Sequence, residues 1–265
     1  MFAAMMRRRD ERIDLGLSAL LIAKEEYPRL AIEDYVERLD QLAADFQVEV
    51  DVDADGPATC RALARFLAAE HCFSGDRDDY YDPRNSYLND VMDRHTGIPI
   101  SLSVLYIEVA RRAGLALLPV AFPGHFLIKH TSERGDVYLD PYTGGRLLDL
   151  EGCRQLFAGS YGSASAFSET MLGAATKRQV IRRMLHNLKR IYALKDEPEK
   201  TLRIVELLTT VTPWDLDEVR DRGILLYRLG ETERALADLK AFSENAPPGP
   251  EVESVREMLR KLSHL

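Results

Sequence analysis

The segment that most limits the fold is a stretch in the middle of the chain that is apolar on nearly every side. Residues 101–113 read SLSVLYIEVARRA, in which Glu108, Arg111 and Arg112 are the main charges. Pro99 stands just before them, at a position where a proline commonly opens a helix. A helix without a polar face has to be surrounded by protein, so this stretch predicts a buried central helix.

After this helix the sequence changes to short apolar runs between turn residues. Pro123-Gly124 and Thr143-Gly144-Gly145 are two of the turns. Apolar runs of this length, bounded by glycine and proline, are typical of strands. The predicted strands cover residues 117–122, 126–129, 137–139 and 146–148. The fold class predicted for the middle of the chain is therefore α+β, with an antiparallel sheet against the buried helix.

Both ends of the chain have helical periodicity instead. In the first 72 residues, Ile32, Tyr35, Val36 and Leu39 recur at helical spacings, which indicates helices that pack on the core. A passage rich in Gly, Ser and Ala precedes the second helical region. The predicted organisation is an N-terminal helical region at residues 1–72, a core at residues 73–170 and a helical region at residues 176–265.

The second helical region contains an internal repeat. Residues 219–247 align with residues 185–213 at an offset of 34, which is the period of tetratricopeptide repeats. The later copy has small, large and helix-breaking residues where two closing helices need them: Gly223, Leu226, Gly230, Ala235, Leu239, Phe242 and Pro247. A last helix at residues 252–262 would cap the stack. An ordinary helical bundle with a coincidental offset is the alternative.

Composition narrows the classes of function. The formal net charge is −8 at pH 7, so the chain lacks the basic excess that drives binding to phosphate backbones. No apolar run approaches the ~18 residues of a membrane-spanning helix, and the start of the chain does not have the order of a secretory signal. Three cysteines at unrelated spacings argue against a disulfide framework. We therefore expect a cytoplasmic protein that binds neither nucleic acid nor membrane.

The residues able to carry chemistry lie in the predicted sheet. His125 stands at the start of one strand and Asp140 at the end of another. Strands paired as a hairpin would bring the two side chains together, and a carboxylate can then orient a histidine as a general base. A histidine with a structural role is the alternative. A metal site shared with His130 is disfavoured, because residues five apart on a strand point to opposite faces.

These motifs resemble those of the SirB1 family. The resemblance is carried, in order, by NSYL at residues 85–88, GIPISLSVLY at 97–106, PGHF at 123–126 and DP at 140–141. It covers the chain from about residue 73 to the C-terminus. The resemblance implies a transglutaminase-like (papain-like) core followed by tetratricopeptide-like repeats. In that superfamily a cysteine opens the central helix, and a histidine and an aspartate follow on neighbouring strands.

The resemblance carries the histidine onto His125 and the aspartate onto Asp140, but it places Pro99 where the superfamily has its cysteine. Proline has no thiol and no backbone N–H, so the helix N-terminus has no thiolate to activate. Ser101 could supply a hydroxyl instead, although capping the first turn of the helix is its alternative role. Cys72 or Cys60, each on a different helix, could also reach the site.

The sequence therefore predicts a non-catalytic transglutaminase-like protein that acts as a protein-binding, scaffold or regulatory module. A peptide-like ligand would be held in a pocket formed by Tyr80, Tyr81, Asp82, Arg84, Asn85 and Pro99. The repeats would offer a concave surface to a protein partner, with Leu226 and Tyr227 on its face. The alternative is a hydrolase of amides or esters that uses Ser101, His125 and Asp140. We expect no cofactor and no metal.

Overall fold

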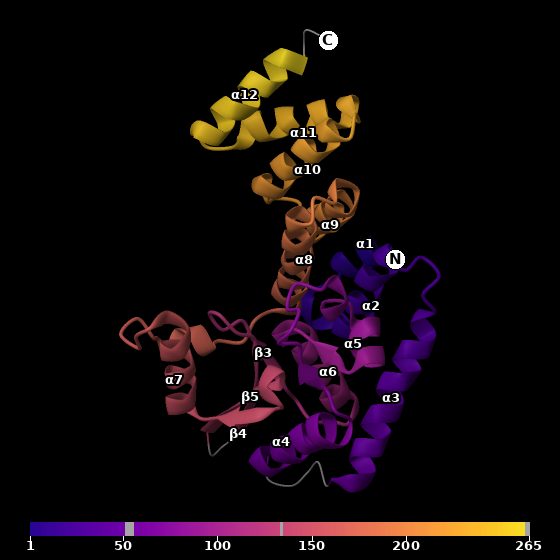
Figure 1. The fold of residues 1–265 in the computed structure, drawn as a ribbon, viewed down its shortest axis with the longest axis vertical. Helices are drawn as coiled ribbons and strands as arrows, with labels where there is room; N and C mark the ends of the chain where they lie inside the picture. The colour runs from indigo at the N-terminus through magenta and orange to yellow at the C-terminus, as the bar shows by residue number, and fades with distance from the viewer. Residues whose placement is uncertain (51–55, 133–134, 263–265) are drawn as a thin grey trace. The chain divides into compact units, whose positions relative to one another are not determined.

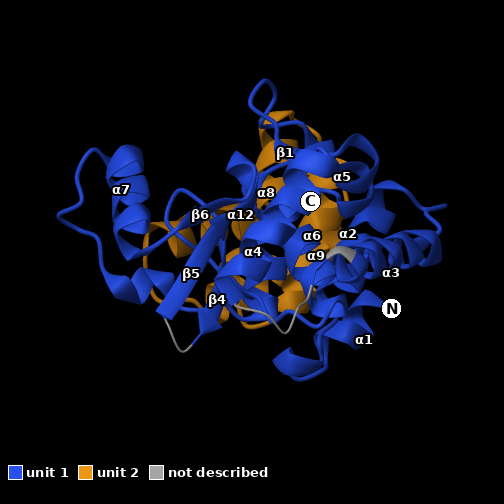
Figure 2. Ribbon diagram, turned by 90° about the horizontal axis from the view of Figure 1, so that it is seen from below, with its two compact units in different colours: residues 1–184 blue, residues 185–265 orange. Residues whose placement is uncertain are grey.

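The computed structural model describes residues 1–50, 56–132 and 135–262, which divide into two compact units. Unit 1 comprises residues 1–184 and unit 2 residues 185–265 (Figure 2). The boundaries predicted at residues 72 and 170 both fall within unit 1 and stay predictions. No helix in the described ranges is long and apolar enough to cross a membrane.

Unit 1 begins with helices that enclose its core. They are α1 (Phe2–Met6), α2 (Leu15–Glu26), α3 (Ile32–Glu49) and α4 (Gly56–Ala64), with a 3-10 turn, η1 (Asp10–Arg12), before α2 and a π-helical segment, η2 (Arg65–Glu70), after α4. In α3 the buried residues include Ile32, Leu39, Ala43 and Phe46. This apolar stripe at helical spacing explains why α3 packs on the core with one face only.

The centre of unit 1 is α6 (Pro99–Arg112). Every residue of this helix as far as Ala110 is buried, as the lack of a polar face predicts. Glu108 is only 1% exposed. Its carboxylate is paired with Arg111, at 3.0 Å, and with Arg112. The acid of this helix is thereby neutralised, as a buried charge requires.

An antiparallel sheet lies between α6 and α7 (Leu150–Tyr161) (Figure 1). Its strands are β3 (Leu118–Val120), β4 (Leu127–Ser132), β5 (Gly135–Asp140) and β6 (Arg146–Leu148), in that spatial order. Side chains alternate between the two faces along β4. Leu127 joins the cluster of Cys153 and Phe157 from α7, while Ile128 is buried on the α6 side. The sheet thus has apolar cover on both faces.

Short elements connect these layers in unit 1. β1 (Ser74–Gly75) and β2 (Thr96–Gly97) form a parallel pair that flanks α5 (Leu88–Arg94) in the chain. Three 3-10 turns complete the unit: η3 (Pro83–Asn85), η4 (Pro141–Thr143) and η5 (Glu169–Leu172). The turns η3 and η4 follow Asp82 and Asp140, each of which accepts a hydrogen bond from the backbone of its own turn. Side-chain caps therefore fix both turns.

Unit 2 is helical throughout its described part. α8 (Lys177–Leu194) begins in unit 1 and is followed by α9 (Pro198–Val211), α10 (Leu216–Arg228), α11 (Thr232–Asn245) and α12 (Pro250–Leu262). A Cβ at Gly223 of α10 would lie 2.9 Å from Leu239 of α11, so these helices approach closely because Gly223 has no side chain. Gly230 follows α10 with a φ of 82°. The small residues of the predicted repeat thus lie where two helices close on each other.

Gly145, in the turn before β6, has a close neighbour that Gly144 lacks. Both have a positive φ, 76° at Gly144 and 73° at Gly145. Only at Gly145 would a Cβ clash, at 2.6 Å from the Cβ of Ala64. The N–H of Gly145 also donates to the carbonyl of Asp140 at 2.9 Å. This turn therefore holds the end of β5 against α4.

We expect Gly144→Ala to lower the free energy of unfolding by about 1 kcal/mol, the cost of a left-handed conformation for alanine. Gly145→Ala should cost a further ~1–3 kcal/mol, because overpacking against Ala64 is added to the same backbone cost. Urea denaturation of the full chain, followed by circular dichroism, measures both values. Equal losses from the two substitutions would contradict the close packing of this turn.

Candidate functional site

The loop before α5 is held by a network around Asn85. This side chain is fully buried. Its Nδ2 donates to Asp76 Oδ2 at 2.9 Å and to the carbonyl of Asp79 at 2.8 Å, and its Oδ1 accepts from Arg94 Nη1 at 3.0 Å. Hydrogen bonds from the backbone N–H of Asp79 and from Asn85 lower the pKa of the Asp76 carboxyl. Asn85 therefore fixes the path of the loop.

The other predicted pocket residues of this loop fall into two groups. Asp82 is 6% exposed and accepts from Arg84 Nε at 2.8 Å. Burial raises the pKa of Asp82, but the bonds from Arg84 outweigh burial and leave the pKa below its ordinary value. Tyr80 and Tyr81 are at the surface, with ring centroids 5.4 Å apart. A ligand role for these four residues stays a prediction.

Hydrogen bonds close off the N-terminus of α6. Pro99 is buried at the first position of the helix. Ser101 is fully buried, and its Oγ donates to the carbonyl of Asn85 at 2.6 Å and accepts from the N–H of Ile98 at 3.1 Å. The bond from the N–H of Ile98, the N-cap residue, is the one that the third helical residue makes in a capping box. Ser101 would have to give up both bonds before its hydroxyl could attack a ligand.

A turn encoded in the sequence positions His125. Its N–H donates to the carbonyl of Phe122 at 3.1 Å, which closes a turn with Pro123 in the second position and Gly124 in the third. Gly124 has a φ of 73°. Proline followed by a glycine with positive φ is the pattern of a type II turn. His125 therefore leaves the turn just before β4, at the edge of the sheet where β5 ends.

The imidazole of His125 faces a hydroxyl from α7. Its Nε2 lies 3.1 Å from Ser160 Oγ. From α8, Arg183 Nη2 donates to the His125 carbonyl at 2.9 Å, and the guanidinium lies 5.4 Å from the ring centroid of Phe126. Burial lowers the pKa of His125 below 6.5, and the charge of Arg183 acts in the same direction, while Asp140 opposes both. The imidazole is therefore mostly neutral at pH 7.

Asp140 lies at the same edge of the sheet but is engaged in another contact. It is 1% exposed, and its Oδ1 accepts from the N–H of Tyr142 at 3.1 Å. Its charge acts on the pKa of His125, whereas the ring hydrogen bond of His125 goes to Ser160. The buried hydroxyl of Tyr106 on α6 has no hydrogen-bond partner among the described residues. Burial, followed by the charge of Asp140, raises the pKa of this hydroxyl.

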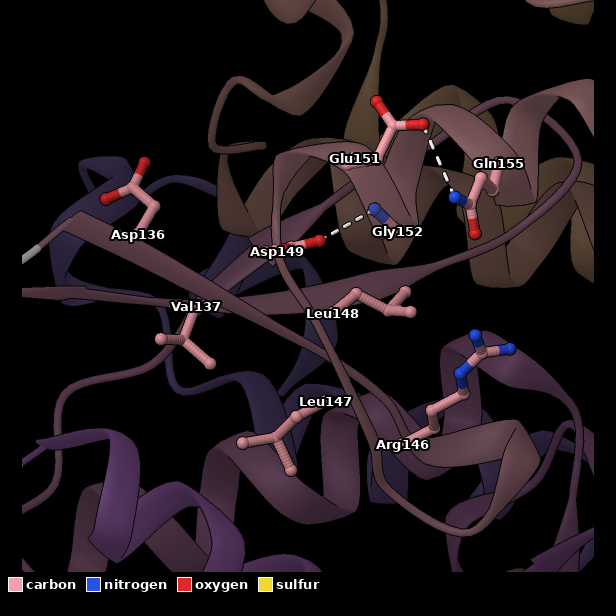
Figure 3. Close-up of a pocket in the computed structure, with 9 residues that line it drawn as sticks. All are labelled: Asp136, Val137, Arg146, Leu147, Leu148, Asp149, Glu151, Gly152 and Gln155. Atoms are coloured by element: carbon pink, nitrogen blue, oxygen red, sulfur yellow. Dashed lines mark hydrogen bonds between the residues drawn. The ribbon is translucent and has the colours of Figure 1, made fainter.

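Two adjoining pockets open beside His125. One, of about 410 Å³, is lined by His125 and Ser160 and also by Arg146 and Gln155. The other, of about 490 Å³, shares Arg146 and Gln155 and extends to Asp136 (Figure 3). Within the described part of the chain, Arg146 has no ion-pair partner. The joint cleft therefore offers an unpaired guanidinium and a neutral imidazole to a ligand.

The cysteines of unit 1 differ in exposure. Cys60 and Cys153 are fully buried, and burial raises the pKa of each thiol to about 12. Cys72 is exposed and has a φ of 58°. A thiol is nucleophilic as the thiolate, so the two buried cysteines are protonated and inert at neutral pH.

Comparison with known proteins agrees with this architecture. The family model described as the transglutaminase-like superfamily matches residues 33–186, and the model described as the tetratricopeptide repeat matches residues 188–260. The chain belongs to the transglutaminase-like superfamily. No solved structure matches it significantly. The predicted α+β fold, a transglutaminase-like core followed by a tetratricopeptide-like helical region, is confirmed.

Relatives of this transglutaminase-like protein cover nearly the whole chain. A UPF0162 protein of Xylella fastidiosa (strain Temecula1) is 37% identical over 258 residues, which are 96% of this chain and 92% of the relative. Protein SirB1 of Salmonella typhimurium is 28% identical over 239 residues, which are 90% of this chain and 88% of that protein. The resemblance to the SirB1 family is confirmed. A transglutaminase-like domain joined to tetratricopeptide repeats indicates a protein-interaction module.

Two residues of this transglutaminase-like site carried no signal in the sequence. Ser160 follows His125 by 35 positions and Arg183 follows it by 58. Neither belongs to a motif, and their approach to His125 depends on how α7 and the start of α8 pack within unit 1. Sequence spacing alone cannot reveal such contacts.

The structural role of Ser101 can be tested against Ser103, which is equally buried on the same helix. Ser101→Ala should lower the free energy of unfolding by ~1 kcal/mol or more, because the N–H of Ile98 and the carbonyl of Asn85 both lose this partner and keep only their 3.2 Å bond to each other. Ser103→Ala should cost less, since its hydroxyl only reaches the carbonyl of Phe126 at 3.4 Å. Urea denaturation of both variants measures the difference. A loss no larger for Ser101→Ala than for Ser103→Ala would refute the capping role.

The titration of His125 should respond to its two charged neighbours in opposite directions. Asp140→Asn should lower the pKa of His125, because the opposing negative charge is lost, and Arg183→Gln should raise it. Proton NMR of the imidazole signals measures these shifts. Arg146→Gln is the control, because Arg146 lines the same pocket but is not among the causes of the His125 shift. A rise of the pKa in Asp140→Asn would contradict the geometry.

The lowered pKa of His125 also sets the sign of a pH effect. The unfolded chain takes up a proton at this residue near pH 6.5, whereas the folded chain does so only at lower pH. The unfolded state therefore binds more protons in that window, and the stability of unit 1 falls as the pH drops below 6.5. His125→Asn should weaken this dependence.

Proposed function

We propose that this chain is a non-catalytic transglutaminase-like protein that acts as a protein-binding, scaffold or regulatory module. The observation that carries the proposal is Pro99 at the buried first position of α6, the position to which the sequence resemblance assigns the superfamily's cysteine. Proline supplies neither a nucleophilic atom nor a backbone N–H at that point. The thiol chemistry of the superfamily therefore lacks its first step.

Other nucleophilic groups of unit 1 support the same proposal. The hydroxyl of Ser101 is buried in two hydrogen bonds of the helix N-terminus. The thiols of Cys60 and Cys153 are held in the protonated state by burial. None of these three groups is exposed, as a nucleophile in a covalent mechanism has to be.

The cleft beside His125 is suited to binding. Arg146 is exposed in it and has no ion-pair partner within the described residues, so its N–H groups can donate to a carboxylate or a carbonyl. The imidazole of His125 adds its Nδ1, because its Nε2 lies 3.1 Å from Ser160 Oγ. A peptide-like segment offers carbonyl and amide groups of this kind, so we assign such a ligand to the cleft.

Unit 2 would hold a protein partner by exposed side chains of α10. Ile224 and Tyr227 are 37% and 39% exposed and lie three residues apart, so they share one face of the helix. Leu226 is buried and packs with Leu202 and Ala235. Of the two residues predicted for the partner-binding face, only Tyr227 is therefore available.

One observation favours a second candidate function, acyl transfer to water from an ester or amide. Ser160 is exposed and lies 3.1 Å from the neutral imidazole of His125. This hydroxyl is better placed for attack than that of Ser101, which the predicted set of Ser101, His125 and Asp140 requires. The hydroxyl of Ser160 is also 3.2 Å from the carbonyl of Leu156, a backbone bond that a serine in a helix often makes.

A fluorophosphonate probe separates the two functions, because it labels serines activated as nucleophiles. We expect no labelling of the full-length protein above that of His125→Ala. Labelling that is abolished in Ser160→Ala or Ser101→Ala would overturn the non-catalytic proposal and identify the nucleophile.

Binding is tested with partners that are first captured by the full-length protein and then purified and reconstituted. Ile224→Glu combined with Tyr227→Glu should weaken the reconstituted complex at least tenfold, because two charges replace apolar contacts. Arg190→Glu, an exposed change on α8, is a matched surface control. Retention of every partner at full affinity by the α10 variant would count against a partner surface on α10.

A further inference from the structure

Unit 2 exposes an indole that the fold does not use. Trp214 is the only tryptophan of the chain and is 70% exposed. Its backbone is held in a turn, since the N–H of Asp215 donates to the carbonyl of Thr212 at 3.0 Å. Thr212 is buried, and its Oγ1 donates to the carbonyl of Leu208 at 3.2 Å. A large apolar ring that is exposed to water on a backbone held in this way suits a surface that a partner covers.

A groove of about 680 Å³ lies beside this indole, where the start of α10, the end of α11 and the start of α12 meet. Phe242 and Val252 are 2% exposed and belong to the apolar cluster beneath it. Pro247 and Pro250 line it as well. The groove thus combines a rigid apolar base with an exposed aromatic ring.

The rim of the groove is acidic. Its lining includes Asp215, Asp217 and Glu251 and no lysine, arginine or histidine. Arg220 does not line the groove, but its Nη1 donates to Asp217 at 3.0 Å and to Glu251 at 2.8 Å, and its guanidinium lies 5.4 Å from the ring centroid of Phe242. Its Nε and Nη2 are occupied by Asp221, at 3.0 and 2.9 Å. One guanidinium therefore orders two rim carboxylates while its charge is shared among three acids, and the rim stays negative.

Helix stability accounts for only part of this arrangement. Acidic residues in the first turn stabilise a helix, and Asp217 and Glu251 occupy the first turns of α10 and α12. That effect requires neither an indole nor a groove beside these acids. The joint presence of the ring, the groove and the carboxylates needs a further explanation.

We infer that this groove binds an arginine side chain of a partner protein, with an apolar residue beside that arginine in the partner's chain. A guanidinium stacks flat on an indole and pairs with carboxylates at its edge, which Trp214 and the acidic rim permit together. The neighbouring apolar side chain would cover the base formed by Phe242 and Val252. The inference deepens the proposed function, on which it rests, by giving the chemistry of a partner segment for unit 2.

A library of twelve-residue peptides with random sequence tests the preference directly. Labelled full-length protein should retain peptides enriched in arginine next to an apolar residue. Trp214→Ala should lose this enrichment, whereas Ile224→Ala should keep it, because Ile224 does not line the groove. Circular dichroism serves as the folding control, and an exposed side chain such as Trp214 can be truncated without unfolding the chain. No enrichment of arginine, or the same enrichment in Trp214→Ala, would overturn the inference.

Fluorescence then measures affinity at this position alone, since the chain has one tryptophan. The most enriched peptide should shift the emission of Trp214 saturably, and the same peptide with citrulline in place of arginine should bind at least about tenfold more weakly. Asp217→Asn combined with Glu251→Gln should reduce the preference for arginine over citrulline. Equal affinities of the two peptides for the wild-type protein would contradict recognition of the charge.

The two proposals fail in different ways. If a reconstituted partner binds through Ile224 and Tyr227 while no arginine preference appears, the inference about the groove is wrong and the proposed function stands. If the groove selects arginine peptides but the fluorophosphonate probe labels a serine, the non-catalytic proposal is wrong and the groove remains.

Discussion

Unit 1 depends on the burial of α6, and the first backbone N–H groups of a helix have no partner within the helix. Its first backbone donors cannot be solvated, so each needs a partner or has to be absent. Pro99 removes one donor, because proline has no N–H. Ser101 accepts from the N–H of Ile98 and ties the turn to the carbonyl of Asn85. The sequence resemblance assigns the superfamily's cysteine to this position, and proline is a residue that suits a buried helix start there.

This helix start limits what His125 and Asp140 can do. In a thiol mechanism the histidine would take a proton from a cysteine at the start of the central helix. Here His125 is held by its type II turn and bonds Ser160, and Asp140 caps η4 through the N–H of Tyr142. Both residues thus make contacts that the loops around the sheet need. Their presence in the sequence is compatible with stability as well as with chemistry.

The parts that the sequence predicts are those set by local rules. Proline and glycine in order place the turn at His125, helical spacing identifies α3, and an offset of 34 residues identifies the repeat. Contacts between distant segments escape such rules. Ser160 and Arg183 reach His125 only because α7 and α8 pack beside it. The sequence also places Leu226 on the exposed face of the repeat, but Leu226 is buried and only its neighbour Tyr227 is exposed.

The N-terminal segment supports the start of α8, the helix that leads into the repeats. Two repeats fall short of the three that usually fold independently, so the first helix of the array needs support. That helix, α8, starts inside unit 1, where Asp10 of η1 accepts from the N–H of Lys177 and from the N–H of Arg178, each at 2.9 Å. One carboxylate near the N-terminus of the chain thus caps the start of α8. Because the cap satisfies two of its first donors, unit 1 orders the helix from which the repeat region continues.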